Sequence, residues 1–124
     1  MKHYTVCLAL VLFMVTPAVV LAVDSVDFEV QTTKNLLNLC TVAPQDELYA
    51  EAINFCHGYL IGAYHYHHVS KKGEAQVCVP EPQPSRNAMI GKFISWAESH
   101  PQYNNELPVE TEFRFLMETW PCSK

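Results

Sequence analysis

The sequence predicts an all-α domain, a small bundle of about four helices stapled by two disulfides. Three observations support this fold class. Apolar residues recur at helical spacing in several separate segments, no segment alternates like a strand, and an apolar leader precedes four cysteines, Cys40, Cys56, Cys78 and Cys122. The length of 124 residues suits one domain. Because so small a core is only marginally stable, we expect the disulfides to contribute substantially.

Residues 1–22 have the pattern of a cleavable secretory signal peptide. A basic start at Lys2 precedes an apolar run from Val6 to Val15, and Val20-Leu21-Ala22 offers a cleavage site. An uncleaved membrane anchor is the alternative. It is disfavoured because Pro17 interrupts the apolar stretch short of the roughly 20 residues that cross a bilayer.

Cleavage would leave one domain over residues 23–124, since removal of 22 of the 124 residues leaves 102. Loss of Lys2 would change the formal net charge from −5 to −6. A chain this acidic is a poor partner for nucleic acid, and we expect no membrane contact after cleavage. The even number of cysteines in an exported chain predicts two disulfides.

The first mature segment, Val26 to Cys40, is expected to be helical at least from Thr33, a plausible cap. Its apolar residues are Phe28, Leu36, Leu37 and Leu39.

The central helix is predicted between Pro44 and His68. Its apolar or small residues recur over several turns, at Leu48, Tyr49, Ala52, Ile53, Cys56, Tyr59, Leu60 and Ala63. Pro44 suits a first helical turn, and Asp46 and Glu47 in that turn would interact favourably with the helix dipole. Gly58 and Gly62 are four residues apart, and each costs about 1 kcal/mol relative to alanine inside a helix. We therefore expect another backbone to pack closely against them.

A proline-rich loop, Val69 to Pro84, is predicted to follow, because its composition cannot continue a helix. A disulfide at Cys78 would anchor this loop to the rest of the domain. Ser85 then caps a third helix, which ends at His100-Pro101. The apolar residues of this helix are Met89, Ile90, Phe93, Ile94 and Ala97.

The last helix is expected to open at Pro108 and to end at Pro121. Its predicted apolar face holds Val109, Phe113, Leu116, Met117 and Trp120. On the opposite face, Arg114 is spaced to pair with both Glu110 and Glu118.

Four cysteines allow three pairings, and the helix order ranks them. If the helices alternate up and down, Cys40 faces Cys56 across the first hairpin, and Cys78 lies at the same end as Cys122. We favour these two pairs. Pairing of Cys56 with Cys78 is the alternative.

A histidine-rich stretch ends the central helix and raises the question of a metal site. His65 and His68 are three residues apart, and Glu74 or His57 is the nearest further ligand. However, His57 and His65 are eight residues apart, about 12 Å along a helix. We therefore expect solvated histidines and no metal ion, with pH sensing as an intermediate alternative.

No residue pattern favours catalysis, and no cofactor is expected. Cys56-His57 resembles a nucleophile with a base, but Cys56 is expected in a disulfide. The serines lie outside any nucleophile-elbow motif, and the carboxylates are expected on exposed helix faces. Four aromatic residues are expected in the core on helical spacing, namely Tyr59, Trp96, Phe113 and Trp120.

Several short motifs in fixed order resemble the Rap/Tai family of type VI secretion immunity proteins. They are Cys40, Phe55-Cys56-His57-Gly58-Tyr59-Leu60-Ile61-Gly62-Ala63, Cys78-Val79-Pro80, Trp96, His100-Pro101 and Trp120-Pro121-Cys122. The resemblance covers essentially the whole mature chain. The chain departs from many family members at His65, where they carry an acidic residue.

The resemblance implies a small periplasmic helical protein, often a homodimer, that binds and blocks a peptidoglycan-cleaving amidase without catalysing a reaction. We expect the partner to be contacted by the end of the central helix and the segment Val69–Gln76. The expected contact residues are Tyr64, His65, Tyr66, His67 and His68. The alternative function is a solitary periplasmic housekeeping protein, such as an acid-responsive chaperone that uses these histidines as a switch.

Overall fold

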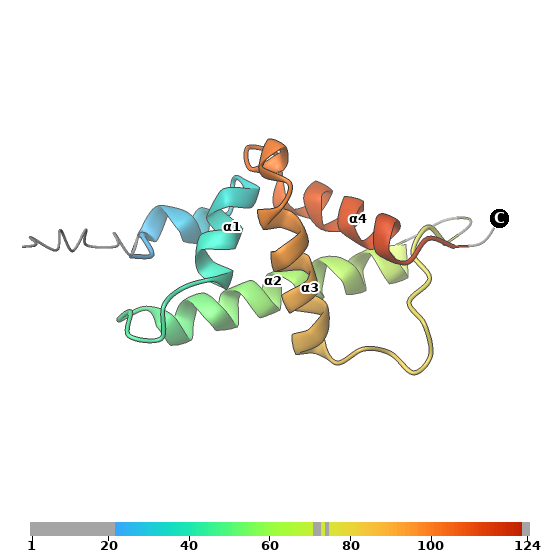
Figure 1. The fold of residues 1–124 in the computed structure, drawn as a ribbon, viewed down its shortest axis with the longest axis horizontal. Helices are drawn as coiled ribbons and strands as arrows, with labels where there is room; N and C mark the ends of the chain where they lie inside the picture. The colour runs from blue at the N-terminus through green and yellow to red at the C-terminus, as the bar shows by residue number, and fades with distance from the viewer. Residues whose placement is uncertain (1–21, 71–72, 74, 123–124) are drawn as a thin grey trace, which may run out of the picture.

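The computed structural model describes residues 22–70, 73 and 75–122, so the predicted signal peptide falls almost entirely outside the described residues. In these ranges the chain forms four α-helices and no strand, which confirms the predicted all-α class. The elements, in order, are η1 (Ser25–Glu29), α1 (Thr33–Cys40), α2 (Tyr49–Ser70), α3 (Arg86–Glu98), η2 (Pro101–Tyr103) and α4 (Pro108–Thr119) (Figure 1).

The short helix α1 lies at the centre of the packing. It contacts α2, α3 and α4, and α4 in turn packs on α2 and α3. Figure 1 shows α2 along the long axis of the molecule, α4 beside its C-terminal half, and α3 crossing steeply. The core contains side chains from all four helices, including Leu36, Leu39, Cys56, Phe93 and Phe115.

Helix α1 begins at Thr33, as predicted, but its cap is Thr32 and not Thr33. The hydroxyl of Thr32 accepts a hydrogen bond from the Asn35 N–H (3.2 Å), and the Asn35 side-chain oxygen accepts one from the Thr32 N–H (3.1 Å). Thr33 is instead buried, and its hydroxyl lies 2.7 Å from the hydroxyl of Thr111 in α4. The residue expected as a cap therefore joins two helices.

The prediction that Pro44 opens the central helix is wrong, because α2 begins at Tyr49. The carboxylate of Asp46 accepts hydrogen bonds from the backbone N–H groups of Leu48 (2.9 Å) and Val23 (3.2 Å). These bonds hold residues 44–48 as turns and anchor the start of the described chain. A side chain expected to stabilise the first helical turn thus stabilises the turn before it.

A buried carboxylate, Asp27, joins η1 to α1. It accepts hydrogen bonds from the side-chain amides of Asn35 (3.1 Å) and Asn38 (2.9 Å) and from the Asp24 N–H (3.1 Å). Burial by itself raises the pKa of this carboxyl, but the three hydrogen bonds and the charge of Lys34 outweigh burial and lower it. The expectation that carboxylates lie on exposed faces is wrong for Asp27.

The third helix follows the sequence closely. The hydroxyl of Ser85 accepts a hydrogen bond from the Ala88 N–H at 3.3 Å, so the predicted cap is confirmed. The helix ends at Glu98, just before the predicted stop at His100-Pro101. Trp96 is half-buried, and its ring stacks on that of His100 with centroids 4.1 Å apart.

The last helix begins at Pro108 as predicted, but its buried face is rotated from the expected one. The buried residues are Pro108, Thr111, Glu112, Phe115 and Leu116, whereas Val109 and Met117 are exposed. Phe113 and Trp120 are half-buried against the core, as is Tyr59 of α2. The predicted pairs of Arg114 with Glu110 and Glu118 are also wrong, because its guanidinium pairs with Glu106 (3.0 Å) before the helix.

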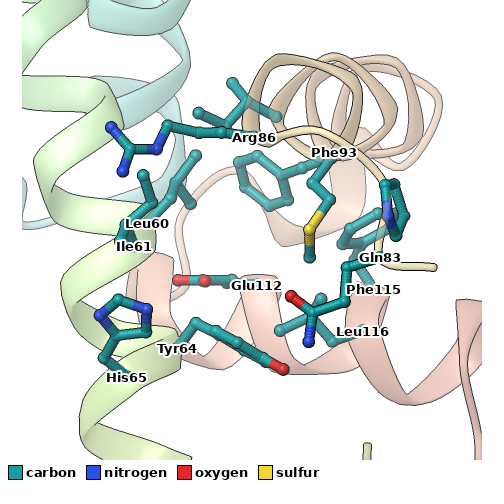
Figure 2. A pocket seen from close by; sticks show the side chains of 13 residues that line it. Leu60, Ile61, Tyr64, His65, Gln83, Arg86, Phe93, Glu112, Phe115 and Leu116 are labelled. Carbon is teal, nitrogen blue, oxygen red and sulfur yellow. The ribbon is translucent and has the colours of Figure 1, made fainter. Parts of the chain in front are cut away.

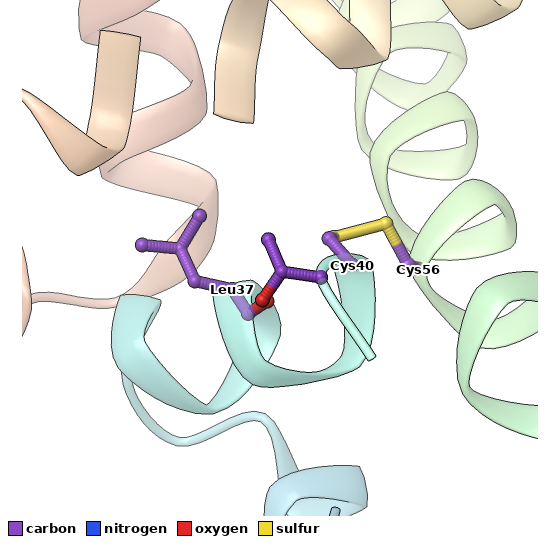
Figure 3. Close-up of a disulfide and its surroundings, with 4 residues drawn as sticks. Leu37, Cys40 and Cys56 are labelled. Carbon is purple, nitrogen blue, oxygen red and sulfur yellow. A yellow bond between two sulfur atoms is a disulfide. The ribbon is translucent and has the colours of Figure 1, made fainter. Parts of the chain in front are cut away.

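The favoured disulfide pairing is confirmed. Cys40 at the end of α1 is bonded to Cys56 in α2, with Cα atoms 5.2 Å apart (Figure 3). Cys78 in the loop is bonded to Cys122 after α4, with Cα atoms 4.9 Å apart. Beside this second disulfide, the Cys78 N–H donates to the Trp120 carbonyl at 2.9 Å, and Val77 forms an antiparallel bridge with Pro121. The loop is therefore held by backbone pairing as well as by its cysteine.

The two glycines of α2 do not contact another backbone within the described chain. A Cβ placed on Gly58 or on Gly62 would have no heavy atom within 4 Å outside its immediate surroundings. The expected close packing is therefore wrong within one molecule, and both positions face open space.

Candidate functional site

The candidate site is a pocket between α2, α3 and α4, with a volume of about 200 Å³. It forms because α2 and α3 each pack on α4 but, over the described residues, are not among the helix pairs that pack closely on each other. Its apolar walls come from Leu60 and Ile61 of α2, Met89, Ile90 and Phe93 of α3, and Phe115 and Leu116 of α4. Tyr64, His65, Gln83, Pro84 and Arg86 complete the lining.

Glu112 of α4 contributes the buried polar group of this pocket. Figure 2 shows its carboxyl group in the middle of the lining, between Arg86 and Phe93 on one side and Tyr64 on the other. Its side chain is 4% exposed, and its Oε2 atom is buried without a hydrogen-bond partner among the described residues. Burial raises the pKa of this carboxyl from its ordinary value of 4.5 to about 9. Glu112 is therefore an uncharged carboxylic acid at neutral pH.

Tyr59 lies next to this carboxyl on α2. Burial raises the pKa of the Tyr59 hydroxyl, the negative charge that Glu112 acquires at high pH raises it further, and a hydrogen bond with the backbone of Val109 partly offsets both effects. Both groups are thus uncharged at neutral pH. The pocket offers a neutral hydrogen-bonding group inside apolar walls.

The apolar face predicted for the last helix excludes Glu112, and that face differs from the one that is buried. A periodic pattern does place it inside. Thr111 and Glu112 precede Phe115 and Leu116 by three or four residues, so a helix that buries the Phe115-Leu116 pair also buries Glu112. The expectation of exposed carboxylates is wrong here as well.

The predicted contact residues lie in three different surroundings. Tyr64 and His65 line the pocket, and the Tyr64 ring stacks on His68 with centroids 6.3 Å apart. His67 points instead toward α4, where its ring lies 4.4 Å from that of Phe113. Tyr66 and Val69 are 73% and 80% exposed.

The surface beside the pocket is therefore the C-terminal end of α2, which we call the α2 tip and define as residues 64–70. Of the further predicted segment Val69–Gln76, residues 71, 72 and 74 lie outside the described ones. The tip combines exposed aromatic, apolar and imidazole groups, which are suited to contact with another protein.

The residues considered for a metal site do not converge. Over the residues that the structure describes, no group of three His, Cys, Asp or Glu side chains is arranged to hold a metal ion. Glu74, one candidate ligand, falls outside those residues. Cys56, the candidate nucleophile, is bonded to Cys40 and carries no free thiol.

No helix in the described ranges has both the length and the hydropathy needed to cross a membrane. The two disulfides fit an oxidising compartment.

Comparison with known proteins gives one match. No curated protein and no solved structure matches the chain. The family model described as Rap1a immunity proteins matches residues 32–122, a range that runs from the cap of α1 to the last disulfide cysteine and includes the pocket. This match agrees with the resemblance found in the sequence motifs, and we conclude that the chain belongs to the Rap1a immunity protein family.

Proposed function

We propose that this protein is a periplasmic immunity protein that binds and inhibits a peptidoglycan-cleaving amidase effector of type VI secretion. The observation that carries the proposal is the Rap1a family match over residues 32–122. Residues 1–22 would serve as the signal peptide, and the disulfides suit the periplasm. The protein would act by occupying its target, without catalysing a reaction.

The α2 tip supports this proposal as a binding surface. Tyr66 and Val69 project from the C-terminal end of α2, a helix whose N-terminal half is fixed by the Cys40–Cys56 disulfide and which packs on α1. A rigid helix that presents exposed aromatic and apolar groups loses little conformational entropy on binding. We therefore propose that the effector contacts the α2 tip. A second proposal is that the protein acts as a homodimer.

The experiment is capture of a partner from periplasmic and secreted proteins of the same organism by the oxidised mature protein, followed by inhibition of the captured amidase, measured as release of soluble fragments from purified peptidoglycan. We expect the oxidised mature protein to abolish hydrolysis at a stoichiometric ratio. Tyr66→Ala should weaken inhibition about tenfold or more, because exposed tyrosines are common interface anchors. Tyr49→Ala is the matched control, since Tyr49 is an exposed tyrosine at the opposite end of α2.

Equal effects of the two variants would move the interface away from the α2 tip. Failure to bind any hydrolase, together with binding of unfolded proteins only below about pH 6, would instead favour the acid-responsive chaperone.

A further inference from the structure

The pocket between α2, α3 and α4 has room for one side chain of a partner. Its volume is about 200 Å³, below the roughly 300–1,000 Å³ of typical small-molecule sites. An apolar cavity of about 150 Å³ is enough to hold benzene. Phe93, Phe115 and Tyr64 supply aromatic walls, and aromatic rings pack favourably against one another. The pocket is therefore matched to a single aromatic ring.

The orphaned carboxyl of Glu112 determines which aromatic ring fits best. A buried polar atom without a partner destabilises the folded protein, and a ligand that supplies the missing hydrogen bond recovers part of that cost. Oε2 of Glu112 is such an atom, and it lies among the residues that line the pocket. A plain hydrocarbon ring would fill the space but leave the carboxyl unsatisfied.

The groups around Glu112 favour a neutral donor over a cation. Tyr59 of α2 lies beside it, and the other titratable or charged side chains that line the pocket are Tyr64 and His65 of α2 and Arg86 of α3. The guanidinium of Arg86 at the pocket repels an incoming cation, and an uncharged Glu112 does not compensate for that repulsion. A phenol carries no charge and presents one hydroxyl that donates and accepts hydrogen bonds.

We propose that this pocket is an anchor site for one tyrosine side chain of the bound effector, whose hydroxyl hydrogen-bonds to the carboxyl group of Glu112. The inference rests on the proposed function and assigns a specific contact to it. The ring lies between the walls of α2 and α3, beside the α2 tip, so one partner surface reaches both. Arg86 lies at the same site, where a guanidinium can pack on the face of the incoming ring.

The first part of the test uses small probes on the oxidised mature protein, with binding measured by NMR titration of the pocket residues. The probes are p-cresol, toluene and benzylammonium, which share one ring and differ in polarity. We expect p-cresol to bind about tenfold more tightly than toluene, the equivalent of one buried hydrogen bond. Benzylammonium should bind most weakly. Equal binding of toluene, or tightest binding of benzylammonium with release of a proton, would overturn the proposal.

Two variants separate the hydrogen bond from the shape of the pocket. Glu112→Gln keeps a carbonyl acceptor and should retain p-cresol, whereas Glu112→Leu should bind p-cresol no better than toluene. If Glu112→Leu does not fold, Met89→Trp at the half-buried rim should fill the pocket and abolish binding of both neutral probes. If p-cresol binds to Glu112→Leu or to Met89→Trp as tightly as to the parent, the pocket is not the tyrosine site.

The second part uses the effector. Glu112→Leu or Met89→Trp should weaken amidase inhibition about tenfold. Changing one tyrosine of the effector to phenylalanine should cause the same loss, and combining that change with Glu112→Leu should cause no further loss. If the parent protein binds p-cresol but these variants inhibit the amidase as well as the parent does, the effector does not occupy the pocket. The proposed anchor site would then be wrong, while the immunity function would stand. Binding of p-cresol by a protein that inhibits no amidase would show that the proposed function itself is wrong, and the effector's tyrosine with it.

Discussion

Burial of Glu112 links the stability of the fold to pH. In the unfolded chain this carboxyl releases its proton near its ordinary pKa of 4.5, whereas in the folded protein it keeps the proton up to about pH 9. Between these values the unfolded state binds fewer protons than the folded state. The free energy of unfolding therefore falls as pH rises through this window and levels off above it.

Glu112→Gln should remove this pH dependence, because glutamine has a similar shape and no proton to release. At pH 8 we expect the variant to be more stable than the parent by about 2–4 kcal/mol, whereas at pH 4 the two should be nearly equal. Urea denaturation at both pH values measures the difference. Glu110→Gln is the matched control because Glu110 is exposed on the same helix. A constant difference at the two pH values would show that Glu112 does not titrate as described.

At the scale of single residues, the sequence identified side chains more reliably than it identified their roles. The sequence predicts that Thr33 and Asp46 are polar residues near helix starts, which is correct. Each, however, has a hydrogen-bond partner that is distant in sequence: Thr33 bonds to a residue 78 positions away, and Asp46 accepts a bond from the N–H of Val23. Local rules cannot foresee such partners, because the partners are brought near only by the packing of other helices.

At the scale of helices, α2 is less stable than its packing would allow, because it has two glycines in its interior. Gly58 and Gly62 are exposed in its interior, and open space surrounds the position that a Cβ would take at each. Neither glycine permits a close approach within the described chain. Each therefore costs backbone entropy without a compensating contact in the monomer.

Gly58→Ala and Gly62→Ala should each raise the free energy of unfolding by about 0.5–1 kcal/mol. Thermal and urea denaturation measure the gain. Gly91→Ala in α3 is the matched control, since this glycine is also exposed and faces open space. If the α2 variants lose stability while Gly91→Ala gains it, a second copy of the chain packs against α2 and the homodimer is supported.

For the whole molecule, the two disulfides differ in exposure and in the length of chain that they close. Cys40 and Cys56 are buried in the core and are 16 residues apart, whereas Cys78 is exposed, Cys122 is half-buried, and they are 44 residues apart. On loop length alone, the two bonds stabilise the fold by about 3 and about 4 kcal/mol respectively. The bond that closes the longer loop is the more accessible one.

Mild dithiothreitol should therefore reduce Cys78–Cys122 before Cys40–Cys56, because thiol exchange requires access to a sulfur atom. Alkylation at timed intervals followed by mass spectrometry of peptides measures the order. After the first step, the far-ultraviolet circular dichroism should still be that of a helical protein, with a lowered melting temperature. Alkylation of Cys40 and Cys56 first, or of all four cysteines together, would contradict this order.

The sequence by itself determined the helical class, the ends of α3, the start of α4 and the family, and it favoured the cysteine pairing that the structure shows. These properties depend on local signals, namely proline and serine positions, apolar spacing and the order of short motifs. Tertiary structure alone decided where α2 begins, which face of α4 is buried and where the pocket lies. The physical reason is that each depends on contacts between distant segments. Asp46 holds the turn before α2 through Val23, and α1, α2 and α3 all pack on α4 and together decide which side of it faces inward. Glu112 acquires its neutral, buried state from helices α2 and α3, which are distant in sequence, so the spacing within α4 indicates its burial only once the inward face of that helix is known.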